Sequence, residues 1–109
     1  MFKVTDERIV KNWPVDVVVP IDGGDTQRHP IKVDLKITDT VDANKVLMGQ
    51  EPELKMCLVG WEGIANEIGE PIEFSESARD TLLKNPHFTQ SVVRAYQDCV
   101  AGRPAEKNS

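Results

Sequence analysis

Residues 31 to 37, IKVDLKI, alternate strictly between apolar and charged side chains. Successive side chains of an extended strand point to opposite faces, so this period of two places every apolar residue of the stretch on one face. The pattern predicts a half-buried strand. We expect its inner face, which consists of Ile31, Val33, Leu35 and Ile37, to lie against the helices of the fold.

A partner strand precedes this one in the chain. Residues 14 to 20, PVDVVVP, are rich in β-branched side chains and are bounded by two prolines, which cannot donate a hydrogen bond to a β-ladder. Residues 21 to 29, IDGGDTQRH, predict a long hairpin loop in which Gly23 and Gly24 supply positive φ angles. Residues 2 to 10 are less regular, and we expect them to add a third strand at the sheet edge.

The apolar period changes after residue 40 to between three and four, which is typical of helices. We expect a short helix that carries Val41, Val46, Leu47 and Met48 and is capped by Asp39 or Thr40. A second helix is expected from about Glu51 to Gly60, with Leu54, Cys57, Leu58 and Trp61 at spacings i, i+3, i+4 and i+7. Ser75 is expected to cap a third helix. The fourth is expected from Pro86 to about Ala101, with Asn85 as its N-cap and Gly102 at its end.

This order of elements predicts an α+β fold, in which a small antiparallel sheet of two or three N-terminal strands packs against three or four C-terminal helices. We expect a single domain over residues 1–102, followed by a disordered polar tail over residues 103–109.

The charge balance argues against some classes of partner. A net charge of -5 and a pI near 5.0 do not suit a domain that neutralises phosphates, so we expect no nucleic acid partner. No apolar run approaches the roughly 20 residues that span a bilayer, and MFKVTDERIV lacks the apolar stretch of a secretory signal. We therefore expect a cytoplasmic protein without a membrane partner.

Motifs for catalysis and for cofactors are missing from the sequence. Neither GxGxxG nor GxxxxGK[ST] occurs, and no CxxC pair is present. We therefore expect no enzyme activity, no cofactor and no metal. Cys57 and Cys99 are interpreted as reduced core thiols, and the DGGD stretch at 22–25 as a solvated hairpin tip rather than a calcium loop.

The last predicted helix has a wide apolar face. Its core stripe consists of Phe88, Val92, Ala95, Tyr96 and Cys99, and Val93 and Val100 lie one step round the helix toward Tyr96. One interpretation is that Val93, Tyr96 and Val100 form an exposed surface for a partner. The alternative is that they pack under the loop at 63–74.

Several motifs together resemble the tail assembly chaperones of long-tailed bacteriophages and prophages. They include WPV, VPIDGG, LVGWEGI, GEPIEFSE, an NP break and VVRAYQDCVAGR, which occur in this order over roughly residues 2 to 103. Within them, the stretch Gly60, Trp61, Glu62, Gly63 looks like a family corner where the central helix ends.

The resemblance implies a non-enzymatic assembly protein without catalytic residues. Such a chaperone binds the long, helical tape-measure protein, keeps it soluble and helps to recruit tail-tube subunits, and it is expected to be absent from the mature virion. The partners it implies are the tape-measure protein, the tail-tube protein and further copies of the chain.

Two alternatives stay open at this point. The chain could be a structural tail component, such as a tube or terminator subunit, which is retained in the virion. It could also be a small enzyme or a host-takeover regulator.

Overall fold

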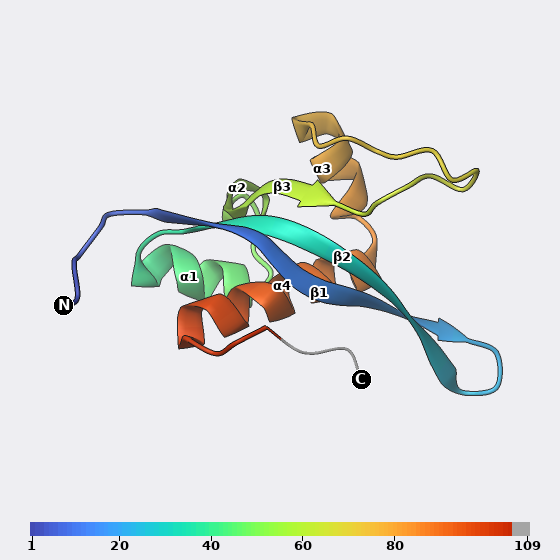
Figure 1. Cartoon of the computed structure of the whole chain (residues 1–109), viewed down its shortest axis with the longest axis horizontal. Coiled ribbons are helices and arrows are strands. Elements are labelled where there is room, and N and C mark those ends of the chain that lie inside the picture. The colour runs from blue at the N-terminus through green and yellow to red at the C-terminus, as the bar shows by residue number, and fades with distance from the viewer. Residues whose placement is uncertain (106–109) are drawn as a thin grey trace.

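The computed structural model describes residues 1–105 of the chain. Within them the chain forms a three-stranded antiparallel sheet with the strand order β1-β2-β3 (Figure 1). Along residues 1–105, two helices lie between the second and third strands and two more follow the third strand. The elements are β1 (Arg8–Ile21), β2 (Asp25–Ile37), α1 (Thr40–Leu47), α2 (Glu53–Cys57), β3 (Leu58–Glu62), α3 (Glu76–Leu82) and α4 (Pro86–Ala101). The predicted α+β fold class is confirmed.

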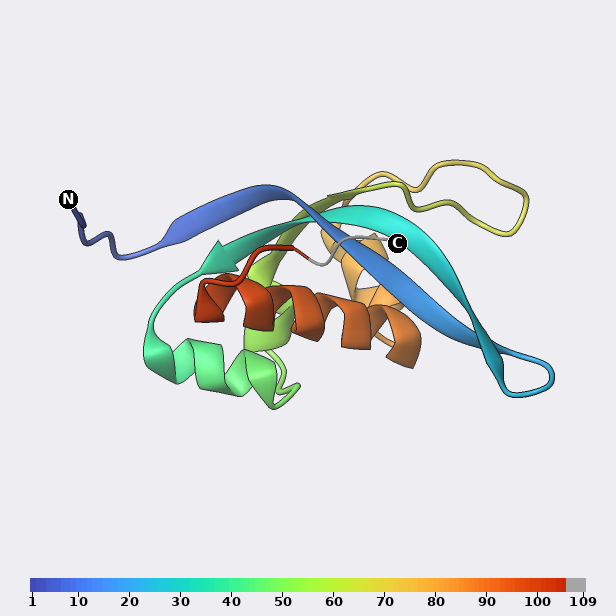
Figure 2. The ribbon, with the colours of Figure 1, turned by 60° about the horizontal axis from the view of Figure 1, so that its bottom comes forward.

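The sheet and the helices form two layers. Figure 2 shows the curved sheet on one side, with α1 and α4 side by side beneath it. The apolar residues of β2 point into this interface: Val33 and Leu35 are fully buried, Ile31 is buried, and Ile37 packs against the core from a half-buried position. The predicted inner face of this strand is therefore confirmed.

The β1–β2 hairpin has a much shorter loop than the sequence predicted. Strand pairing continues up to Ile21 opposite Asp25, so most of the predicted loop at 21–29 belongs to β2. Gly23 and Gly24 have φ angles of 85° and 84°. Because two consecutive residues with positive φ reverse the chain sharply, the strands can continue to the turn and form a long arm.

The third strand does not come from residues 2–10, so that prediction is wrong. Residues from Arg8 onward extend β1, past a bulge between Val10 and Trp13. At this bulge Asn12 has a φ of 57°, and its backbone N–H donates to Asp34 Oδ1 at 2.8 Å. The carboxylate from the neighbouring strand thus binds a backbone donor at the irregularity, which allows β1 to continue.

The predicted helix from Glu51 to Gly60 is also wrong, because α2 ends at Cys57 and the chain continues as β3. Leu58 pairs with Leu35 and Gly60 pairs with Asp34, so β3 supplies the second edge of the central strand with hydrogen bonds. A Cβ atom at Gly60 would lie 2.4 Å from Asp34 Oδ2. Glycine at position 60 thus allows the close approach of β3 to Asp34. The hydrogen bonds between β3 and β2 determine the conformation of residues 58–62, although the apolar spacing of this stretch is helical.

The helix boundaries at the other predicted sites are confirmed. Asp39 and Ser75 each accept a hydrogen bond from the backbone of the first turn, at 2.9 Å and 3.0 Å, and Asn85 caps α4 ahead of Pro86. Gly102 ends α4 with a φ of 70°. Of the predicted disordered tail, residues 106–109 lie outside the described residues.

Candidate functional site

Trp61 lies inside β3 rather than at a corner after a helix. Its indole Nε1 donates to the backbone oxygen of Ile72 at 2.8 Å. The ring makes edge-to-face contacts with Phe74, at a centroid distance of 4.9 Å, and with Phe88 at 6.1 Å. Trp61 therefore packs β3 against the end of the loop at 63–74 and against the first turn of α4.

The other members of the predicted corner divide between strand and loop. Gly60 and Glu62 belong to β3, and Gly63 follows the strand with a φ of 91°. The corner prediction is thus wrong about the preceding helix, although the chain does leave the sheet at Gly63. The left-handed backbone there is accessible to glycine without strain.

The loop from 63 to 74 is an ordered second arm. Ala65 and Pro71 form an antiparallel bridge, and the Ile72 backbone N–H donates to the Ile64 oxygen at 2.9 Å. At its tip, Asn66 Oδ1 accepts from the backbone N–H groups of residues 68 and 70, at 3.1 Å and 2.9 Å. The Asn66 side chain thereby adds to the backbone hydrogen bonds that Asn66 makes with residues 69 and 70, and together they fix the turn at the tip.

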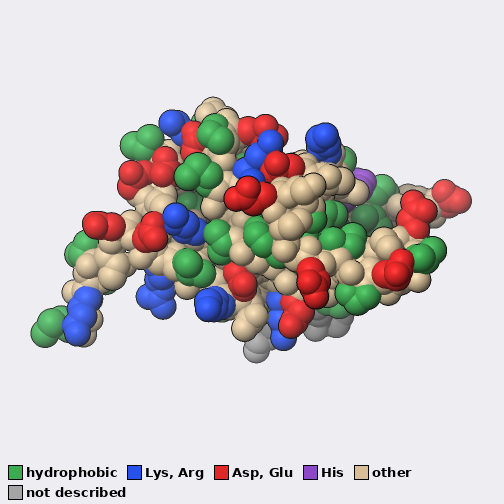
Figure 3. Space-filling model, turned by 90° about the horizontal axis from the view of Figure 1, so that it is seen from above, with side chains coloured by type: hydrophobic (Ala, Val, Ile, Leu, Met, Phe, Trp, Pro, Cys, Tyr) green, Lys and Arg blue, Asp and Glu red, His purple; other side chains and the backbone are tan. Residues whose placement is uncertain are grey.

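Both arms extend toward the same end of the molecule, which measures 47 Å along its longest axis (Figure 1). We call the two tips, residues 20–26 and 64–72, the forked end. Ile21 is 46% exposed and Ile68 is 80% exposed. The exposed carboxylates on the two tips are Asp22, Asp25, Glu67 and Glu70. Figure 3 shows acidic and hydrophobic side chains together at the right-hand end of the view, toward which the two arms extend.

The sequence did contain a signal for the forked end that its interpretation missed. IDGGD and NEIGE each place one isoleucine beside carboxylates and glycine. The first of them was interpreted above as a solvated hairpin tip, and the second was given no role. Only the fold brings these two stretches to the same end of the molecule.

The predicted surface on α4 is corrected for one of its three residues. Tyr96 is only 1% exposed, as its place in the core stripe predicts, so the interpretation that puts it on an exposed surface is wrong. Val93 is half-buried against the same core, and Val100 is exposed. A contact between Val100 and a partner stays a prediction, whereas a charged residue at Val93 would disturb folding.

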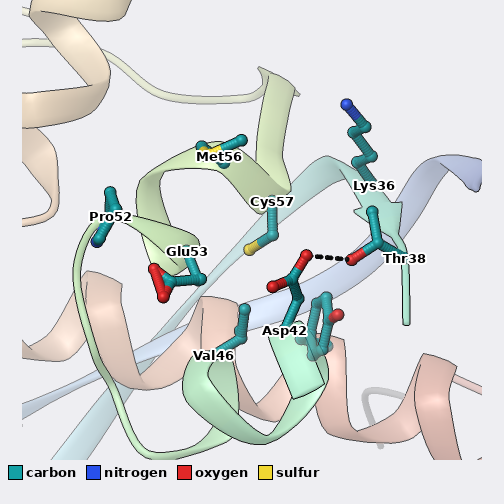
Figure 4. Close-up of a pocket in the computed structure, with 9 residues that line it drawn as sticks. Lys36, Thr38, Asp42, Val46, Pro52, Glu53, Met56 and Cys57 are labelled. Atoms are coloured by element: carbon teal, nitrogen blue, oxygen red, sulfur yellow. Dashed lines mark hydrogen bonds between the residues drawn. The ribbon is translucent and has the colours of Figure 1, made fainter. Parts of the chain in front are cut away.

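A cavity of about 260 Å³ lies where α1 and α2 meet the end of β2 and the middle of α4. Its lining residues are Lys36, Thr38, Asp42, Val46, Pro52, Glu53, Met56, Cys57 and Tyr96. Asp42 Oδ2 accepts a hydrogen bond from the Thr38 hydroxyl at 3.0 Å (Figure 4). In the same view the Asp42 carboxylate and the Cys57 sulfur point toward one another, and the Lys36 ammonium points away from both.

Burial determines the ionisation of the groups around this cavity. Burial is the main cause that raises the pKa of Tyr96 to about 12, and the nearby Cys57, Asp42 and Asp39 groups raise it further. The Cys57 thiol, which donates to the Leu54 oxygen at 3.2 Å, has its pKa raised by burial to about 12. Both groups are therefore neutral at pH 7.

The cysteines are expected to react slowly. Burial raises the pKa of Cys99 to about 11, and the Asp98 carboxylate adds to this shift. The thiolate is the reactive form, so relative to a thiol of pKa 9.0 we expect iodoacetamide at pH 7.5 to alkylate Cys57 about 1,000-fold and Cys99 about 100-fold more slowly. Mass spectrometry of timed samples, with the urea-unfolded chain as the control, measures both rates. Alkylation of either folded thiol at the unfolded rate would contradict the expectation.

Within residues 1–105, no three side chains of the His, Cys, Asp or Glu type are placed to hold a metal ion together. None of the helices described there is both long enough and apolar enough to cross a membrane. In comparisons with known proteins, the chain matches no family model, no curated protein and no solved structure.

Proposed function

We propose that the chain is a non-enzymatic phage tail assembly chaperone, which binds the tape-measure protein, keeps it soluble and helps to recruit tail-tube subunits. The observation that carries this proposal is the forked end, where two ordered arms each present an exposed isoleucine among carboxylates. The motif resemblance over residues 2 to 103 supplies the identity of the client.

The chemistry of the forked end suits a helical client with an apolar stripe flanked by lysine or arginine. Ile21 and Ile68 offer apolar contacts at the two tips, and four carboxylates surround them. An amphipathic helix is recognised through its apolar face, and complementary charge at the rim speeds association and fixes orientation. Such contacts are individually weak, which suits a chaperone that must release its client.

Co-expression tests the proposal directly. We expect the tape-measure protein encoded beside this chain to be found in the soluble fraction when both are produced, and in the pellet when it is produced alone. An unrelated coiled coil of similar length should gain no solubility from the chain. A client whose solubility does not respond to the chain would refute the chaperone proposal.

A matched pair of double variants tests the forked end. Ile21→Asn with Ile68→Asn should weaken client binding about 10-fold or more, because the loss of two central apolar contacts typically exceeds 1.4 kcal/mol. The control, Val41→Asn with Met48→Asn, changes two exposed apolar residues, 62% and 73% exposed, that lie on and just after α1. Pull-down affinities and circular dichroism should be measured for both. Equal weakening by the two pairs would show that the forked end is not the client surface.

A structural tail component is the alternative function, and the composition of purified particles distinguishes the two. The chaperone proposal predicts that the chain is missing from mature virions by mass spectrometry while the tail-tube protein is abundant. Stoichiometric presence of the chain in virions would favour the structural alternative.

A further inference from the structure

We propose that the cavity between α1, α2 and Tyr96 is a binding site for a primary alkylammonium group, carried either by a small free amine or by a lysine side chain. This site lies among different elements from the forked end and does not depend on the proposed function. Its volume of about 260 Å³ is below the roughly 300–1,000 Å³ that is usual for drug-sized ligands, so its occupant must be small.

The walls of the cavity match an aliphatic chain. Apolar surface comes from Val46 on α1, from Pro52 just before α2, and from Met56 on α2. The neutral Cys57 thiol adds a further weakly polar wall. Most of the length of a short alkyl chain can therefore be buried away from water in this cavity.

The polar groups of the cavity match a cation. Asp42 accepts a hydrogen bond from Thr38. None of the ion pairs within residues 1–105 brings a cationic side chain within 4.0 Å of the Asp42 carboxylate. On α2, Glu53 uses Oε1 to bind Lys45 at 3.3 Å, while its Oε2 is buried without a hydrogen-bond partner in the described chain. Lys45 thus already neutralises Glu53, and Asp42 is the carboxylate of the cavity lining that is left to bind a cation.

The lysines near the cavity do not already serve as its cation. Lys36 lines the cavity, but its ammonium pairs with Glu7 at 3.2 Å and points away from Asp42 (Figure 4). Lys45 is held on one oxygen of Glu53. The Asp42 carboxylate, which has no cationic partner among the ion pairs of residues 1–105, therefore favours an external ammonium group over an anion or a neutral alcohol.

Titration with n-pentylamine at pH 7, followed by ¹H–¹⁵N NMR, tests this site. We expect saturable shifts at amides of α1, α2 and the end of β2. The same stem without the charge, n-pentanol, should bind about 10-fold more weakly or worse, because hydrogen bonds to charged groups are the stronger ones. N-acetyl-lysine methylamide distinguishes the two sources: binding equal to pentylamine indicates a lysine side chain, and binding of the free amine alone indicates a small-molecule ligand.

Three variants assign the effect to the cavity. Asp42→Asn keeps the side-chain shape and should weaken pentylamine binding about 10-fold. Met56→Lys, at an exposed position on the cavity rim, should abolish binding because its own ammonium group can occupy the site. Glu51→Gln removes an exposed carboxylate nearby and should change the affinity less than about twofold, since exposed charges are screened by salt.

The proposal is overturned if pentylamine gives no saturable shift up to roughly 20 mM, a concentration at which even a weak complex would be populated. It is also overturned if pentanol binds as well as pentylamine, or if Asp42→Asn and Glu51→Gln have equal effects. The NMR spectrum of each variant reports its folding in the same experiment. None of these outcomes bears on the binding of the tape-measure protein by the forked end.

Discussion

Replacing Leu35 by Ala is expected to lower the free energy of unfolding by about 2 to 5 kcal/mol, the range for large-to-small changes in a packed core. Leu35 is fully buried in the middle strand, where it pairs with Val10 on one side and Leu58 on the other. Its side chain lies against the helices, so the cavity left by the change cannot be filled by movement of a sheet edge. Urea denaturation followed by circular dichroism measures the loss.

Ile9 provides the matched control for this prediction. It lies in β1 opposite Lys36 and is 48% exposed. Ile9→Ala should change the free energy of unfolding by less than about 0.5 kcal/mol, as is usual for surface substitutions. A loss at Leu35 no larger than the loss at Ile9 would contradict the two-layer packing of this sheet.

The parts of the fold that follow from local chemistry could be predicted from the sequence. Alternation over residues 31–37 determines which face of β2 is buried, because a one-residue shift would expose all of its apolar side chains. Asp39, Ser75 and Asn85 mark helix starts because their side chains accept hydrogen bonds from free backbone N–H groups.

The parts that depend on distant pairing could not be predicted. Leu54, Cys57 and Leu58 have helical spacing and are all buried, so the burial was predicted correctly while the conformation was not. Leu58 is buried as a strand residue because β2 needs a partner on its second edge. The spacing of apolar residues in a short stretch cannot distinguish these two cases.

The candidate sites were even less accessible to sequence reasoning. The tip of the hairpin and the tip of the loop at 63–74 are far apart in the sequence, and each alone resembles an ordinary solvated turn. The cavity collects side chains from α1, α2, β2 and α4; the burial of Cys57 and of Tyr96 was predicted, but not that these four elements meet around one cavity. The width of the apolar face of α4 left open whether Tyr96 is exposed or packed, and contacts between α1 and α4 help to bury it.

Replacing Trp61 by Ala is expected to lower the free energy of unfolding by about 3 kcal/mol, the lower end of the range for the truncation of a large aromatic, because Trp61 is half-buried. The change removes the contacts with Phe74 and Phe88 and the hydrogen bond to Ile72 together. Because these contacts hold the base of the second arm, hydrogen exchange at the Ile72 amide should accelerate more than exchange at Val33 in the sheet.

Trp61→Phe separates the two contributions. It keeps an aromatic ring beside Phe74 but removes the indole donor, so the loss should be about 1 kcal/mol, the usual contribution of one hydrogen bond. Equilibrium denaturation of both variants, together with exchange rates at Ile72, provides the comparison. Equal losses for the two variants would mean that the hydrogen bond alone anchors the arm. A loss below about 1 kcal/mol for Trp61→Ala would mean that the forked end is held in place by other contacts, since surface substitutions fall in that range.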